Sequence, residues 1–309
     1  MQMSYPKKSY KYIFGPVSSR RFGSSLGIDL SPFKKCCNFD CVYCELSRAK
    51  VVSMIEEPPL VKDIISELKE ALKEFPNVDV ITLTANGEPS LYPNLKELIK
   101  ELNAIKTTQK TLILSNGTAV LHSDKFDALL DLDIVKFSLD SVVQKTFRKI
   151  DRAIKNYSTD LIVEKMSEFR DKFRGKLILE VLVVSGFNDN ESEFKALNKA
   201  YESIRPDRVD ISSIDRPPAH DVKGVSSDLL YKLSSLITAS KVCVATKKAL
   251  GEKLDFSLDE LRKLLKLRPQ SKFDIENNFS PSSKANLDIL LSNGEAKEFD
   301  LAGVMFYKI

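Results

Sequence analysis

Short apolar runs of strand length alternate along the chain with amphipathic segments of helix length. The apolar runs are rich in Val, Ile, Leu and Thr, which is typical of parallel strands that are covered on both faces. We expect six strands, near residues 26–30, 79–84, 111–115, 134–139, 177–184 and 208–212. Repeated βα units of this kind predict an α/β protein with a parallel sheet.

The helices between these strands are clearest in two places. Residues 60–75 carry their apolar side chains at helical spacing, and Pro76 follows them. Residues 93–105 show the same spacing and begin with Pro93, a residue that suits the first position of a helix.

The alternation of strands and helices fits both an open doubly wound sheet and a barrel. Polar segments follow four of the predicted strands. These segments are residues 86–88, 115–117, 138–140 and 215–217. In either architecture, ligands collect at the carboxyl ends of parallel strands. The sequence therefore predicts a ligand site where these four segments meet.

The chain from about residue 251 shows a different pattern. Three short helices are predicted in LDELRKLLKLRP, KFDIENNF and SPSSKANLDILLSN, and a hairpin turning at Ala302-Gly303 is predicted in EAKEFDLAGVMFYKI. This order resembles a winged helix. We therefore expect a main domain in residues 1–250 and a small winged-helix-like module in residues 251–309.

The charge of this module does not favour DNA binding. Residues 251–309 hold nine basic and ten acidic side chains, and the predicted recognition helix offers only Lys284. Because a DNA reader normally presents a basic recognition face, we expect the module to pack on the main domain or to contact a partner.

The composition is that of a globular protein that resides in a reducing compartment. A chain of 309 residues is long enough for one large domain and a small one. Its first residues, MQMSYPKKSYKYIF, lack an apolar export segment, and the most hydrophobic stretch, KLILEVLVVSGF, is too short to cross a membrane. Four of its five cysteines lie within nine positions, which suits a reducing compartment. We expect a cytoplasmic protein without membrane spans.

Basic residues gather near the N-terminus. Residues 1–35 hold seven basic side chains against the single acid Asp29, and a second basic run, FRKIDRAIK, lies at residues 147–155. Such runs are common on solvated faces. The alternative is a rim that faces phosphates, which would suit RNA or another polyanion.

Three cysteines carry the clearest chemical signal. Cys37, Cys41 and Cys44 are spaced Cys-x3-Cys-x2-Cys. A tight loop with this spacing can direct three thiolates to one side of a cuboidal iron-sulfur cluster and leave the fourth iron open to a small molecule. The alternative is structural zinc, which needs four protein ligands. The sequence offers no second cysteine pair and only two histidines, so it favours the cluster.

This motif resembles the signature of the radical S-adenosylmethionine (SAM) superfamily, which has an aromatic residue, here Tyr43, just before the last cysteine. Residues 86–88, Asn-Gly-Glu, resemble the Gly-Gly-Glu segment of that superfamily, with Asn86 in place of its first glycine. The segments LILSNGT and VKFSLDS resemble its third and fourth strands. The resemblance implies a partial six-stranded (βα)6 radical SAM barrel that is open on one side.

The resemblance also implies the cofactors and their ligands. One 4Fe-4S cluster would be bound by Cys37, Cys41 and Cys44, and SAM would be bound next to it. The residues implied to contact SAM are Tyr43 at the adenine, Gly87 and Glu88 at the methionyl end, Ser138 and Asp140 near the ribose or carboxylate, and Asn116. A reductase such as flavodoxin or ferredoxin is the implied electron donor.

Within the superfamily, the segment FGPVSSRRFGSSLGIDLSPFK and the Asp-Arg-Pro-Pro at residues 215–218 resemble the wyosine-type tRNA synthases. Those enzymes carry a second cluster on cysteines upstream of the radical motif, whereas this chain has no cysteine before Cys36. Their pyruvate-condensing chemistry and tRNA substrate are therefore not carried over. RNA stays a hypothesis beside two alternatives: a peptide or small metabolite substrate, and a non-catalytic iron-sulfur regulator.

Four further polar or cysteine residues have weaker predictions. Arg216 could grip a carboxylate or phosphate, or only shape its Arg-Pro-Pro loop. We expect His220 to be a solvated loop residue, Cys36 to be a spectator, and Cys243 to be buried in a strand or helix.

Overall fold

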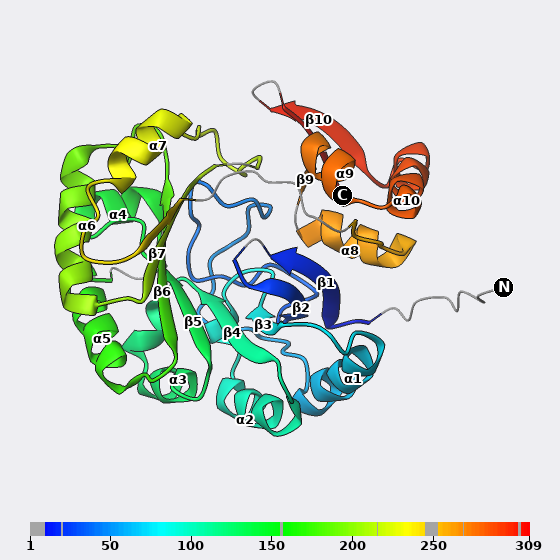
Figure 1. Ribbon diagram of the computed structural model, residues 1–309, viewed down its shortest axis with the longest axis horizontal. Coiled ribbons are helices and arrows are strands. Elements are labelled where there is room, and N and C mark those ends of the chain that lie inside the picture. The colour runs from blue at the N-terminus through cyan, green and yellow to red at the C-terminus, as the bar shows by residue number, and fades with distance from the viewer. Residues whose placement is uncertain are drawn as a thin grey trace.

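The computed structural model describes residues 10–309 except residues 20, 155–156, 215, 245–252, 268 and 302–303. An eight-stranded sheet forms its centre, with the strands in chain order (Figure 1). The strands are β1 (Ile13–Ser19), β2 (Gly23–Asp29), β3 (Val80–Thr84), β4 (Lys110–Ser115), β5 (Ile134–Ser138), β6 (Lys176–Val183), β7 (Arg208–Ser213) and β8 (Val242–Val244). All six predicted strands are confirmed as β2 to β7.

Strands β2 to β8 are parallel, and β1 pairs antiparallel with β2. In the described part of the chain, β1 and β8 do not pair with each other, so the curved sheet is a barrel that stays open between its two edge strands. Cys243 lies in β8, half-buried, in agreement with the strand alternative predicted for it.

Helices cover the outer face of the sheet (Figure 1). They are α1 (Val61–Glu74), α2 (Leu95–Ile105), α3 (Ser123–Leu129), α4 (Gln144–Ile150), α5 (Thr159–Lys172), α6 (Glu191–Ile204) and α7 (Ser227–Ser234), with short 3-10 turns at Pro89–Leu91 and Thr118–Leu121. The two predicted helices are confirmed as α1 and α2. Pro93 does not begin α2, however, because Asn94 is the residue that caps it.

The two faces of the strands differ in kind because successive side chains point to opposite faces. In β2, Leu26 and Ile28 are fully buried in the core under the helices, whereas Ser25, Gly27 and Asp29 line a cavity on the inner face. The same alternation places polar residues of several other strands inside the barrel.

The C-terminal residues form a compact unit with its own apolar core. It consists of α8 (Leu258–Leu267), β9 (Gln270–Ser271), α9 (Lys272–Asn278), α10 (Pro281–Ser292), β10 (Lys297–Leu301) and β11 (Val304–Lys308). The three predicted helices and the hairpin strands are confirmed, and the predicted turn at Ala302-Gly303 lies outside the described residues. The domain boundary and the winged-helix assignment stay predictions.

This C-terminal unit lies at the open side of the barrel (Figure 1). Its helix α8 packs beside β1, and Leu264 and Leu267 line the inner cavity of the barrel. The unit therefore contributes an apolar wall to the cavity.

Among the described residues, no helix is long and apolar enough to span a lipid bilayer.

Candidate active site

The cysteine loop, residues 30–60, connects β2 to α1 and is joined to the end of β3 by backbone pairing. The amide of Cys36 donates to the Asn86 carbonyl at 2.8 Å, and the amide of Glu88 donates to the Cys36 carbonyl at 2.8 Å. Gly87 lies between these bonds at a φ of +134°, where a Cβ atom would be 1.9 Å from the Cys36 carbonyl oxygen. Only glycine suits this close approach.

Cys37, Cys41 and Cys44 lie near one another, since the Cys44 thiolate raises the pKa of both Cys37 and Cys41. Burial raises the pKa of the Cys37 thiol to about 12. Burial also raises the pKa of the Cys41 thiol well above its ordinary value, and the neighbouring Asp151, Cys37 and Cys44 raise it further. Positive metal charge would reverse these shifts, because metal-bound thiols are deprotonated.

The donor set of the three cysteines fits an iron-sulfur cluster. All three donors are thiols, the ligand type that iron-sulfur clusters use, and a cuboidal cluster binds each cysteine through a different iron. A structural zinc ion, in contrast, needs four protein ligands around one centre.

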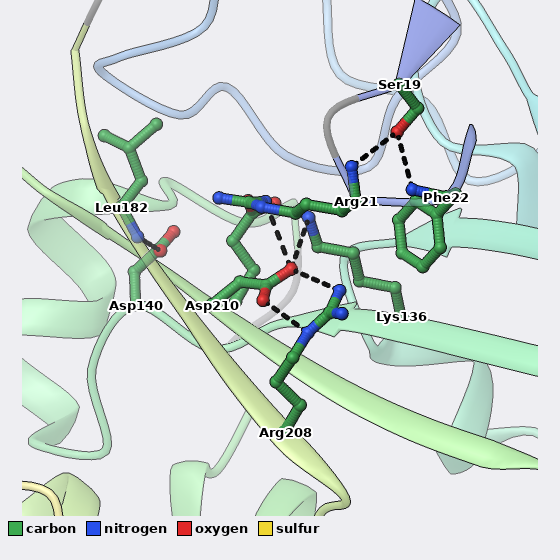
Figure 2. A network of polar contacts seen from close by, with 9 residues as sticks. Ser19, Arg21, Phe22, Lys136, Asp140, Leu182, Arg208 and Asp210 are labelled. Atoms are coloured by element: carbon green, nitrogen blue, oxygen red, sulfur yellow. Dashed lines mark hydrogen bonds and ion pairs between the residues drawn. The ribbon is translucent and has the colours of Figure 1, made fainter. Parts of the chain in front are cut away.

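Tyr43 and Asp140 join the cysteine loop to the end of β5. The Tyr43 hydroxyl donates to Asp140 Oδ2 at 2.5 Å. The Leu182 amide donates to Asp140 Oδ1 at 2.7 Å (Figure 2). Burial raises the pKa of Asp140 to about 7. Two residues predicted from separate motifs are thus brought into direct contact.

Glu88 and Asn116 also come together, at the ends of β3 and β4. The buried Glu88 carboxylate accepts from the amides of Ser90 at 2.9 Å and Asn116 at 2.6 Å. The Asn116 side chain donates to Asn38 Oδ1 in the cysteine loop at 2.7 Å. The Glu88 carboxylate therefore orients backbone around the site.

A cavity of about 930 Å³ opens beside the cysteine loop. Three of the predicted site residues, Tyr43, Cys44 and Gly87, are among the residues that line this cavity. Ser138 lies at the end of β5 and is half-buried. The structure thus brings all the predicted residues to the carboxyl ends of the strands, and places three of them on the cavity wall.

The segment after β7 holds the cysteine loop in place through contacts that the sequence did not predict. The Ala219 amide donates to the Cys44 carbonyl at 2.8 Å, and Arg216 donates to Glu45 Oε2 at 3.2 Å. Arg216 thus pairs within the protein and also lines the inner cavity, so both of the roles predicted for it stay predictions.

The prediction that His220 is solvated is wrong. Its side chain is 10% exposed, and its Nε2 lies 3.1 Å from Asp40 Oδ1. Arg152 approaches the same carboxylate at 3.2 Å. Asp40 and Arg152 were missed as partners because they lie far apart in sequence, one between two cysteines and the other in a basic run.

Asp40→Ala should lower the free energy of unfolding by about 1–2 kcal/mol, because His220 and Arg152 would lose their shared acceptor. Urea denaturation of the cluster-free protein measures the change. Asp124→Ala is the matched control: its side chain is 72% exposed and its nearest cation is Lys125 at 3.5 Å. We expect the control to change stability by less than about 0.5 kcal/mol. Equal effects of the two substitutions would refute the conclusion that Asp40 stabilises the protein through His220 and Arg152.

Residues 31–197 match the Radical SAM superfamily, and the chain belongs to that superfamily. The chain is similar to a UPF0026 protein of Helicobacter pylori (strain J99), with 39% identity over 97% of this chain and 98% of that protein. It is more distantly similar to a probable dual-specificity RNA methyltransferase RlmN of Clostridioides difficile, with 22% identity over 74% of this chain and 67% of the relative.

Two solved structures show the same fold. One is Streptococcus suis SuiB bound to its precursor peptide SuiA, with a TM-score of 0.57, 15% identity, and coverage of 71% of this chain and 48% of SuiB. The other is TYW1 with a lysine-pyruvate adduct bound, with a TM-score of 0.50, 20% identity, and coverage of 74% and 76%.

The expected superfamily, barrel fold and enzyme class are therefore confirmed. Members of the superfamily use a 4Fe-4S cluster and SAM and need a reductant, so this protein is a radical SAM enzyme with those two cofactors.

Proposed function

We propose that this enzyme cleaves SAM at a single cluster bound by Cys37, Cys41 and Cys44, and that it acts on a nucleotide, either within RNA such as tRNA or free. The observation that carries the proposal is the backbone pairing of Cys36 with Gly87, which fixes the cysteine loop above the inner cavity. When bound and reduced, the cluster supplies the electron that splits SAM into methionine and a 5′-deoxyadenosyl radical able to abstract hydrogen.

The residues around the loop would hold SAM in the cavity. Tyr43, fixed by its hydrogen bond to Asp140, would lie against the adenine. Gly87, on the cavity wall, would contact the methionyl end, and Glu88 would support that contact by orienting the backbone of Asn116. A rigid surround of this kind limits reorganisation and excludes water.

Ser138 and Asp140 would complete the SAM site near the ribose or carboxylate. Ser138 is the last residue of β5 and Asp140 lies two residues beyond it, on the same edge of the sheet as Gly87. Asp140 accepts two hydrogen bonds within the protein, from Tyr43 and from the Leu182 amide, so it would act mainly by holding Tyr43.

The nucleotide substrate rests on two observations. The chain is similar to a protein named as an RNA methyltransferase, and residues 1–35 carry a local charge of +6 from seven basic residues and one acid. Among the basic residues that the structure describes, Arg21 lines the cavity and Lys35 lies 3.3 Å from the Cys44 thiol, where positive charge would attract phosphates. Flavodoxin or ferredoxin would serve as the electron donor.

Anaerobic reconstitution with iron and sulfide, followed by dithionite and SAM, tests the chemistry. We expect equal amounts of methionine and 5′-deoxyadenosine, measured by chromatography and mass spectrometry, and neither product without dithionite. A reconstituted protein that contains zinc, or that neither binds nor cleaves SAM, would sink the proposal and favour a regulatory role.

The choice of substrate is tested by tRNA binding at several salt concentrations. If tRNA is the substrate, binding should be tight at low salt and should weaken steeply as salt rises, because phosphate contacts release counterions. Absence of binding at low salt would remove RNA and leave free nucleotides.

A further inference from the structure

The inner cavity reaches well beyond the cysteine loop. It extends from Cys44 and Gly87 to Arg21, Lys136 and Glu180 on the inner face of the barrel. Its volume of about 930 Å³ is at the upper end of the roughly 300–1,000 Å³ that a site for one small ligand occupies. The charged inner end is therefore part of the same cavity as Tyr43 and Gly87, which are predicted to contact SAM.

Five charged side chains form one network at this inner end, which we call the floor cluster. Glu180 lies 2.7 Å from both Arg21 and Lys136. Asp210 lies 2.7 Å from Arg208, 3.1 Å from Arg21 and 3.5 Å from Lys136 (Figure 2). Three cations thus share two carboxylates, which leaves one positive charge in excess.

The excess charge faces the cavity. Arg21, Lys136 and Glu180 line the cavity wall, whereas the side chain of Asp210 is fully buried behind them. The two other carboxylates on the wall have partners of their own: Asp29 accepts from the Ser31 and Asn86 amides, and Glu45 pairs with Arg216. Although burial raises the pKa of Glu180, Lys136 and Arg21 lower it to about 2, so this carboxylate is already charged and is paired with both cations through Oε1. An unbalanced cation in a low-dielectric site is costly and favours an incoming anion.

Hydroxyl groups add hydrogen-bonding capacity on the same wall. Ser25 and Thr82 line the cavity, and their hydroxyl oxygens lie 2.6 Å apart. One hydroxyl hydrogen satisfies that contact, so the second is available to a ligand. Cations together with hydroxyl donors are the groups that recognise carboxylates and phosphates.

We infer that the floor cluster binds the acidic group, a carboxylate or a phosphate, of a small substrate that enters the cavity with that group first. This inference rests on the proposed function: a bound phosphate would narrow the substrate to a free nucleotide, whereas a bound carboxylate would replace the nucleotide by another small acid. A nucleotide within an RNA chain would present its base to the cavity and keep its phosphates outside, where Lys136 could not reach them.

The test is anion binding by the full-length protein, measured by calorimetry without SAM or reductant. The probes are inorganic phosphate and acetate, followed by nucleoside monophosphates and the matching nucleosides. We expect one of the two anions to bind the wild type, which identifies the acidic group. Lys136→Gln should weaken that binding about tenfold, the effect of one charge-assisted hydrogen bond. Glu180→Gln should strengthen it, because it adds to the excess positive charge.

Two further variants separate binding from folding. Lys96→Gln, on the outer surface of α2, should bind as the wild type does. The double variant Lys136→Gln/Glu180→Gln removes one cation and one anion, so it keeps the excess charge and should recover most of the affinity lost in Lys136→Gln. A purely structural network would show no anion binding, or equal affinity in Lys136→Gln and Glu180→Gln, and either result overturns the inference.

The outcome is independent of SAM cleavage. Anion binding with these opposite effects, in a protein that does not cleave SAM, would leave the subsite standing and remove the proposed reaction. SAM cleavage without anion binding would leave the proposed reaction standing and remove the anion subsite.

Discussion

Replacing Cys37, Cys41 or Cys44 with alanine should abolish SAM cleavage. Each thiolate would bind a different iron of the cluster, so loss of any one opens a second iron and destabilises the cluster. We expect the reconstituted variants to fall well below about four irons per chain. Production of 5′-deoxyadenosine should drop to the level of wild type without reductant. Iron analysis, electron paramagnetic resonance of the reduced protein and product assay measure the three effects.

The two other cysteines are the matched controls. Cys36 is 1% exposed but contacts the site through its backbone amide and carbonyl, which alanine retains. Cys243 lies in β8, at the far edge of the sheet. Cys36→Ala and Cys243→Ala should therefore keep the cluster and its activity, at a cost in stability of about 1 kcal/mol at the buried position. Cluster loss in either control, or retention in Cys41→Ala, would contradict the assignment.

The strands of the barrel were predictable because each is a continuous apolar run between polar ends. Strand β1 was missed, since Gly15 and Pro16 interrupt its pattern, and β8 was too short, at three residues, to predict as a strand from periodicity alone. The edge strands of the sheet are thus the ones that its sequence pattern marks least clearly.

The site was predictable to the level of which segments meet, and not of how they touch. Parallel strands bring their carboxyl ends to one edge, so residues 86–88 and 138–140 were expected near each other. The resemblance implied that Tyr43 and Asp140 both contact SAM. Their hydrogen bond depends on how the cysteine loop folds over that edge, which no periodicity encodes. The same holds for Asp40 and His220, which are 180 residues apart.

The floor cluster shows a different limit. Lys136, Glu180 and Asp210 stand on three neighbouring strands, and the runs around Lys136 and Glu180 are mostly apolar. A charge within a buried strand is a signal that the sequence does contain, because charged side chains are rarely buried unless they are paired. Which charges pair with each other follows only from the strand register, and Arg21 joins them from the turn between β1 and β2.

Gly87→Ala should cause the largest loss of stability among single substitutions at the site. The backbone of Gly87 has a φ of +134°, and an added Cβ would lie 1.9 Å from the carbonyl oxygen and 2.4 Å from the carbonyl carbon of Cys36. Both are backbone atoms, so no side-chain rotation relieves the clash. The two hydrogen bonds that join Cys36 to residues 86 and 88 would be lost. We expect the free energy of unfolding to fall by about 3 kcal/mol or more.

Urea denaturation of the cluster-free protein measures this loss, and SAM binding after reconstitution measures its effect on the site. Gly186→Ala is the matched control, because Gly186 also has a left-handed φ, +77°, but nothing lies within 4 Å of an added Cβ. Backbone strain alone should cost the control about 1 kcal/mol and leave SAM binding unchanged. The difference between the two variants isolates the contact between the cysteine loop and β3. Equal losses would mean that Gly87 matters only for its φ, and that the cysteine loop does not depend on this pairing for its position above the cavity.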